Sequence, residues 1–234
     1  MPMKPMVNIN IKNQEFLDIL NEYKDVLMHR DKEDEPPRVT KALILEECSA
    51  SFDAKEWVSD EYMNRIIGQG RGHNGFPKHL KGFRGIKREH TNADEKHFST
   101  PEAIKISDAT AKLNTELGEF LACRNNALNA CYPPGGFISW HNNANAHGYN
   151  IVITWSETGE GWFDYYDLDQ KKRIRIEDKP GWQAKMTYFG PYDDPETLCY
   201  HAAYTDCYRI TVSFVFAQAD NFWRDVIEDL ESPD

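Results

Sequence analysis

Residues 132–143 read Tyr-Pro-Pro-Gly-Gly-Phe-Ile-Ser-Trp-His-Asn-Asn. The Pro-Pro-Gly-Gly run is typical of a turn, and the aromatic and β-branched residues after it are typical of a strand. Because side chains alternate between the two faces of a strand, His141 and Asn143 share one face. The stretch therefore predicts a tight turn followed by a strand that presents a histidine and an amide together.

Downstream of this stretch, short runs rich in Tyr, Trp, Ile and Val recur every 8–15 residues. Such spacing predicts an antiparallel sandwich or barrel. Seven strands are expected, at 137–142, 149–155, 161–167, 173–177, 182–189, 198–204 and 208–217. Residues 220–230 are expected to form a capping helix, because their apolar side chains fall on one side.

Upstream of it, the apolar spacing changes to three and four residues, which indicates amphipathic helices. Helices are predicted at 13–30, 51–67 and 100–130, with a short strand at 41–46. Helices first and a β-core second predict an α+β fold built on a jelly roll.

We expect one compact domain with three parts. Residues 1–130 form a helical N-terminal support region, 131–219 the β-core, and 220–234 a C-terminal helix. The support region contains a Gly-rich segment, 68–100, with seven Lys and Arg against three acids between Arg71 and His97. Such a basic, Gly-rich loop is typical of a lid over a cleft. Its four histidines match no familiar metal-ligand spacing.

The composition narrows the possible partners and the compartment. The 234 residues carry a formal net charge of −11, which disfavours nucleic acid as a partner. No apolar run is long enough for a membrane span or a signal peptide, so no membrane is expected. Five cysteines, an odd number without C-x-x-C spacing, favour reduced thiols and a cytoplasmic location.

Two further residues stand out in the predicted β-core. His201 falls inside an expected strand, 60 residues after His141. Arg209 begins the strand Arg-Ile-Thr-Val-Ser-Phe-Val-Phe, where an arginine is partly buried and needs an anionic partner. That partner is either an acid of this chain or a bound ligand.

In this order, the 132–143 stretch, His201 and Arg209-Ile-Thr211 resemble the iron(II)- and 2-oxoglutarate-dependent dioxygenases, in their prolyl-hydroxylase-like branch. The resemblance covers about residues 130–217 and implies a double-stranded β-helix, which is a jelly roll. It also implies Fe(II) and 2-oxoglutarate as cofactors, with ascorbate as a possible reductant.

The resemblance implies a role for each matching residue. His141 and His201 would be the imidazole ligands of the metal. Arg209 would pair with the distal carboxylate of 2-oxoglutarate, assisted by Thr211, and Tyr132 would donate a hydrogen bond to the same molecule. Two residues are candidates for substrate contact: Trp140, which adjoins His141, and Asn145, which follows the metal strand.

One residue departs from the pattern of the family, which has His-x-Asp or His-x-Glu where this chain has His141-x-Asn143. Four interpretations stay open. Asn143 binds the metal through its amide oxygen, water fills its place, a halide binds there as in the related halogenases, or metal binding is lost.

The leading hypothesis is a dioxygenase that hydroxylates a C–H bond of a peptidyl side chain or small molecule while 2-oxoglutarate becomes succinate. The alternatives are a catalytically weakened binding or sensing module that keeps the co-substrate pocket, and a halogenase-like or cupin-like variant.

Overall fold

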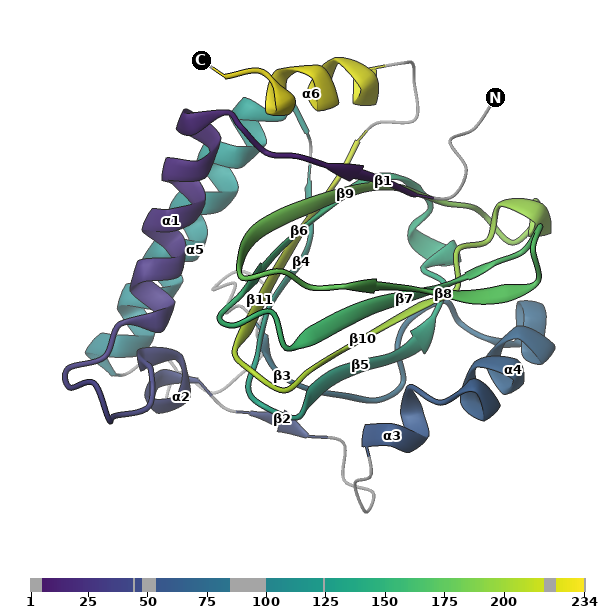
Figure 1. Cartoon of the computed structure of the whole chain (residues 1–234), viewed down its shortest axis with the longest axis horizontal. Helices are drawn as coiled ribbons and strands as arrows, with labels where there is room; N and C mark the ends of the chain where they lie inside the picture. The colour runs from purple at the N-terminus through teal and green to yellow at the C-terminus, as the bar shows by residue number, and fades with distance from the viewer. Residues whose placement is uncertain are drawn as a thin grey trace.

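The computed structural model describes residues 6–43, 45–47, 54–84, 100–123, 125–216 and 222–233. Two curled antiparallel sheets lie face to face in the centre, and helices cover their outer surfaces (Figure 1). The predicted α+β fold with a jelly-roll core is confirmed. Among the described residues, no helix combines the length and the apolar content needed to cross a membrane.

Each sheet of the core contains four strands that pair antiparallel with their neighbours. The first sheet runs in the order β4 (Asn125–Tyr132), β11 (Arg209–Val215), β6 (Gly148–Ser156) and β9 (Gly181–Phe189). The second runs in the order β5 (Gly136–His141), β10 (His201–Thr205), β7 (Gly161–Asp167) and β8 (Lys172–Glu177).

Three shorter strands extend these sheets. β1 (Met6–Ile9) pairs with β9, β3 (Leu80–Arg84) pairs with both β4 and β5, and β2 (Glu46–Glu47) pairs with β3. Because β3 joins β4 to β5, it closes one side of the sandwich.

Alternation along β11 separates the core from the site. Ile210, Val212 and Phe214 point outward into a hydrophobic cluster, whereas Arg209 and Thr211 line a cavity between the sheets. Their period of two follows from the pleat of the strand. The space between the sheets is therefore polar at one end and is not part of the main core.

The main core lies between the first sheet and helices α1 (Gln14–Met28), α5 (Pro101–Phe120) and α6 (Phe222–Glu231). Phe16 and Leu20 of α1, one turn apart, are fully buried against it. The Asn13 side chain caps α1 by accepting a hydrogen bond from the Phe16 N–H at 2.9 Å. Figure 1 shows α1 and α5 side by side across one end of the molecule.

A second core covers the outer face of the other sheet. It is formed by α3 (Ala54–Trp57) and α4 (Asp60–Gln69), whose Tyr62 and Ile66 pack against Phe137 and Trp140 of β5. The two cores thus hold the sheets from opposite outer sides and leave the inner faces for the site.

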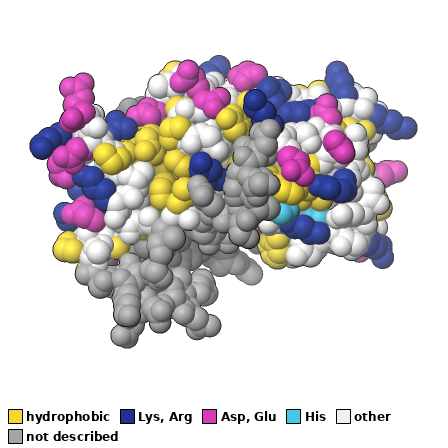
Figure 2. Space-filling model, turned by 90° about the horizontal axis from the view of Figure 1, so that it is seen from below, with side chains coloured by type: hydrophobic (Ala, Val, Ile, Leu, Met, Phe, Trp, Pro, Cys, Tyr) yellow, Lys and Arg dark blue, Asp and Glu magenta, His cyan; other side chains and the backbone are white. Residues whose placement is uncertain are grey.

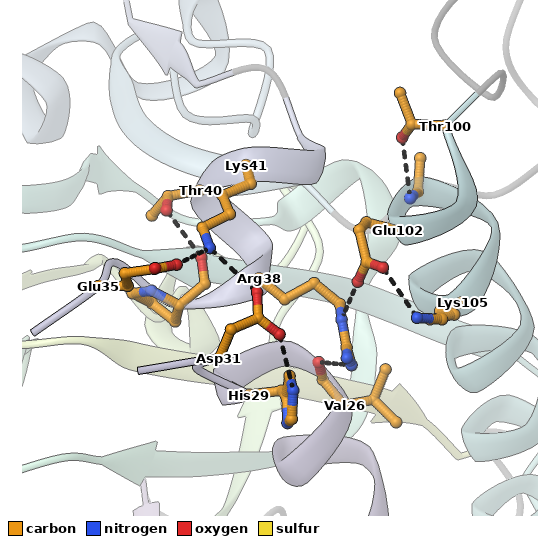
Figure 3. Close-up of polar contacts among 12 residues, drawn as sticks. Val26, His29, Asp31, Glu35, Arg38, Thr40, Lys41, Thr100, Glu102 and Lys105 are labelled. Atoms are coloured by element: carbon orange, nitrogen blue, oxygen red, sulfur yellow. Dashed lines mark hydrogen bonds and ion pairs between the residues drawn. The ribbon is translucent and has the colours of Figure 1, made fainter. Parts of the chain in front are cut away.

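A polar cluster ties α2 (Arg38–Ala42) to the helices beside it (Figure 3). The Arg38 guanidinium donates to the Val26 carbonyl oxygen at 2.8 Å and to the Glu102 carboxylate. Glu102 also accepts from Lys105 at 2.8 Å. These contacts connect α1, α2 and α5, so the first half of the chain is anchored to the helix that precedes the core.

The prediction of one helix over 100–130 is wrong at its C-terminal end. Helix α5 stops at Phe120, and Ala122 has a left-handed φ of 46°, which ends the helix. The residues after it form β4, the strand that the sequence analysis missed. Leu128 continues the helical spacing only by coincidence, because a short apolar run fits either period.

Three other predictions need correction. Residues 41–46 are not a strand: α2 ends at Ala42 and only β2, Glu46–Glu47, is extended. The helix expected over 51–67 is two helices, because the Ser59 side chain accepts from the Tyr62 N–H at 3.1 Å and begins α4. Part of the expected loop, 80–84, is strand β3. Residues 85–99 of that loop lie outside the described residues.

Candidate active site

Two histidines face each other across a strand pair inside the cavity. His141 ends β5, His201 begins β10, and the register places them directly opposite one another. Their ring centroids are 4.1 Å apart, and both side chains are buried. Sixty residues of sequence separation are thus reduced to contact distance by one antiparallel pairing.

The backbone fixes which ring nitrogen of each histidine carries hydrogen. His141 Nδ1 lies 2.8 Å from the Ser139 carbonyl oxygen, and His201 Nδ1 lies 2.8 Å from the Cys199 carbonyl oxygen. A carbonyl oxygen only accepts, so each Nδ1 donates and each Nε2 keeps a lone pair. This is the tautomer that a metal-binding histidine needs.

Burial also keeps both rings neutral. It lowers the pKa of His201 to about 4, because the charged imidazolium loses its hydration. Burial, followed by repulsion from His201, lowers the pKa of His141 well below its usual value. At neutral pH, two unprotonated nitrogens are therefore ready to bind a metal.

Asn143 supplies a third polar group beside them. Its backbone has a left-handed φ of 53°, which asparagine tolerates, and its N–H donates to the Gly75 carbonyl oxygen at 2.8 Å. Its Nδ2 lies 3.4 Å from His201 Nε2. Rotating the amide by 180° would bring Oδ1 to the same point, so position 143 is within reach of a metal held by the histidines.

These three residues fit a divalent transition metal, with two imidazole nitrogens and one amide oxygen as the donors. Among the residues that the structure describes, no group of three or more His, Cys, Asp or Glu side chains is arranged to hold a metal. The donor set is thus neutral. Anionic charge for the metal has to come from a bound ligand.

Arg209 is almost fully buried, 2% exposed, and both alternatives for its partner are relevant. Its Nε donates to Asp178 Oδ2 at 2.7 Å, and Nη1 donates to Thr211 Oγ1 at 2.8 Å. Asp178 was not singled out from the sequence, where it is one of 38 acids. Since Arg209 also lines the cavity, the remaining Nη hydrogens are available to a carboxylate.

Tyr132 stands opposite Arg209 in the register of β4 and β11, and it also lines the cavity. Gly82 of β3 makes room for its ring, because a Cβ at Gly82 would lie 2.8 Å from Tyr132 Cδ1. The structure therefore brings Tyr132, Arg209 and Thr211 to one cavity with His141, Asn143 and His201.

The cavity has a volume of about 350 Å³. Its walls carry the apolar side chains of Phe76, Pro77, Leu80 and Ile138 in addition to the polar groups described above. Polar and apolar residues thus face the same enclosed space, as in a small-molecule site.

The two candidates for substrate contact lie elsewhere. Trp140 points away from His141 into the second core, is fully buried, and does not line the cavity. Asn145 is exposed on the outer side of the loop and borders a separate shallow groove with Arg71 and Tyr192. Strand alternation explains Trp140, because residues 140 and 141 face opposite sides of β5.

Trp140→Ala is therefore expected to act on stability. Removing a fully buried indole should lower the free energy of unfolding by about 3–5 kcal/mol, as measured by urea denaturation. Metal affinity of the folded variant should stay within twofold of the wild type. Unchanged stability together with weaker ligand binding would place Trp140 at the site after all.

No protein-family model matches the sequence, and no curated protein shows significant similarity to it. Solved structures do match. A prolyl hydroxylase from Trichoplax adhaerens, in complex with a hypoxia-inducible-factor peptide, is 12% identical with a TM-score of 0.42, over 98% of this chain and 88% of that one. A prolyl-4-hydroxylase from Pseudomonas putida is 12% identical with a TM-score of 0.34, over 86% and 100%.

The dioxygenase for auxin oxidation 1 from Arabidopsis thaliana, in its 2-oxoglutarate complex, is 11% identical with a TM-score of 0.35, over 88% of this chain and 80% of that one. Identities and TM-scores at this level say nothing of the reaction, so the chemistry of this chain depends on its own site residues. Prolyl hydroxylases and 2-oxoglutarate dioxygenases are among the structures that this chain is similar to, as the resemblance of its motifs predicts.

Proposed function

We propose that this protein is an iron(II)- and 2-oxoglutarate-dependent dioxygenase that hydroxylates a C–H bond of a peptidyl side chain or small molecule. One observation carries the proposal. Two neutral Nε2 lone pairs and the free edge of a buried guanidinium face a single cavity of about 350 Å³. That combination suits a metal and a carboxylate-bearing chelator bound together.

In the proposed reaction, 2-oxoglutarate, O₂ and a substrate C–H give succinate, CO₂ and a substrate C–OH. His141 and His201 would hold the iron, which supplies O₂ activation when it is bound. Arg209 would bind the distal carboxylate of 2-oxoglutarate through its Nη hydrogens, while Thr211 fixes the guanidinium. Tyr132 would direct its hydroxyl to the same co-substrate from the opposing strand.

The neutral donor set favours a dianionic co-substrate. Two imidazoles and an amide leave the double positive charge of the metal uncompensated, whereas 2-oxoglutarate brings two negative charges. A metal and this acid would therefore stabilise each other in the cavity. This reasoning supports 2-oxoglutarate over a neutral ligand.

We propose a small-molecule or peptidyl substrate and not nucleic acid. The apolar side chains of Phe76, Pro77 and Leu80 suit an uncharged substrate group near the metal. Over the described part of the face in Figure 2, acidic and basic side chains are interspersed and do not form one basic patch. A cytoplasmic location is also proposed, because the four described cysteines, Cys123, Cys131, Cys199 and Cys207, are free thiols.

The test is turnover of the co-substrate. Protein supplied with iron(II) and ascorbate should convert 2-oxoglutarate to succinate, slowly alone and faster with a substrate drawn from peptide or small-molecule libraries. Succinate is measured by mass spectrometry, with the metal chelated as the control. Absence of both succinate and iron binding would refute the enzyme.

A second candidate is a binding or sensing module that keeps the pocket but does not turn over. The amide at Asn143 in place of a carboxylate favours it. Binding of metal and 2-oxoglutarate without succinate formation, with any substrate offered, would support this candidate over the enzyme.

A further inference from the structure

Lys185 of β9 is a buried cation that the proposed function does not yet use. Its side chain is 1% exposed, and its Nζ has no hydrogen-bond partner among the described residues. The nearest aromatic contact is with Phe163, whose ring centroid lies 5.5 Å from Nζ. A buried charge without a partner is destabilising, so an ammonium in this place calls for an anion.

The sheet register places Lys185 on the same inner face as Arg209. Lys185 is opposite Val152, and Val152 is opposite Ser213, in one row across β9, β6 and β11. The next row contains Thr211, to which Arg209 donates from Nη1. Directly paired residues share a face of a sheet, so guanidinium and ammonium belong to adjacent rows on the cavity side.

Residues around Lys185 border the cavity itself. Val152, Ser213 and Phe163 all line it. Phe163 also stacks on His201, with ring centroids 5.5 Å apart and an interplanar angle of 17°. Lys185 therefore adjoins the wall of the same cavity that contains the two histidines.

The charges explain why a second cation matters. Asp178, fully buried, pairs with Arg209 Nε and cancels its charge, so the pair is neutral overall. Lys185 adds the net positive charge. Burial and then repulsion from Arg209 lower the pKa of Lys185 to about 8, while Asp178 opposes the shift. The amine is thus largely protonated at neutral pH.

We propose that Lys185 is a positioning residue that, with Arg209, selects ligands carrying a distal carboxylate. The inference rests on the proposed function for the identity of the natural ligand, 2-oxoglutarate. Arg209 supplies directional hydrogen bonds, and Lys185 supplies the charge that Asp178 cancels. Dicarboxylic 2-oxo acids are therefore bound in preference to monocarboxylic ones of similar shape.

The experiment compares three acids by isothermal titration calorimetry: 2-oxoglutarate, its monocarboxylic analogue 2-oxobutyrate, and glutarate, which lacks the keto group. Each is titrated with and without Mn(II), which substitutes for iron. Lys185→Met should weaken 2-oxoglutarate and glutarate by about 10- to 100-fold and change 2-oxobutyrate by less than twofold. Lys185→Arg, which keeps the charge, should recover part of the loss.

The matched control is Lys172→Met, which removes an exposed lysine from β8. It should leave all affinities unchanged. Lys185→Met should fold with equal or greater thermal stability in the absence of ligand, because it removes an uncompensated buried charge. Folding is checked by circular dichroism before titration.

The outcomes separate the two proposals. Equal affinity of wild type and Lys185→Met for 2-oxoglutarate overturns the role of Lys185 and leaves the dioxygenase standing. Wild-type binding of glutarate that Mn(II) and the keto group do not improve refutes the co-substrate and retains Lys185. A wild type that binds neither dicarboxylate overturns both.

Discussion

Replacing His201 by alanine is expected to lower the affinity of the protein for a divalent metal by at least about 100-fold. The variant loses one of the two imidazole nitrogens that face the cavity, and the remaining protein donors are His141 and an amide. Changes outside the ligand set of a metal site already cost about 10- to 100-fold, so loss of a ligand should exceed them. Titration with Co(II), followed by visible absorption, measures the effect.

Packing around His201 calls for a second variant. Its ring is stacked on Phe163 and Phe189, with centroids at 5.5 and 4.8 Å, so alanine leaves a cavity and lowers the free energy of unfolding by about 3 kcal/mol. His201→Phe keeps a ring between the two phenylalanines and removes the ligand nitrogen. Both variants should lose metal binding, although the phenylalanine variant should be the more stable of the two.

His147→Ala is the matched control, since this histidine is exposed in the loop six residues after His141. It should bind Co(II) as the wild type does. If folded His201→Phe retained wild-type affinity, His201 would not be a metal ligand, and the proposed function would lose its main support.

The β-core could be predicted from the sequence because its strands are short, well separated and bounded by turn residues. The seven expected strands correspond to β5 through β11, most of them within two residues of the expected limits. β4 was missed because its apolar residues follow a long helix without a Gly or Pro boundary. Only its pairing with β11, more than 75 residues away, makes it a strand.

The site shows the same division. His141 and Asn143 could be placed together because strand alternation is local, and the resemblance supplied His201 and Arg209. Asp178 and Lys185 could not be found in this way, because both act through partners on other strands. Lys185 does carry one local signal: it lies between Ala184 and Met186 in an otherwise buried strand, where a lysine is unusual.

Asn143→Asp is expected to strengthen metal binding in the absence of co-substrate by about 10- to 100-fold. The wild-type donor set is neutral, so a divalent metal binds without charge compensation from the protein. A carboxylate at position 143, whose side chain already lies 3.4 Å from His201 Nε2, would supply one negative charge and a stronger oxygen ligand. Titration with Co(II) or Mn(II) under anaerobic conditions measures the change.

The same substitution should change how metal and 2-oxoglutarate depend on each other. In the wild type, most of the compensating charge comes from the acid, so 2-oxoglutarate should raise metal affinity, and the metal should raise the affinity for 2-oxoglutarate by the same factor. In Asn143→Asp that factor should shrink, because the protein already carries part of the charge. Four titrations, metal with and without acid for each protein, give both factors.

Asn145→Asp is the control that separates ligation from a general field. It adds the same charge two residues further along the loop, at an exposed position outside the cavity. Water and salt screen a charge there, so its effect on metal affinity should stay below about threefold. Equal effects of the two substitutions would mean that position 143 acts only through its charge. A large effect at 143 alone would mean that its side chain reaches the metal, and that the natural amide keeps the site dependent on its co-substrate.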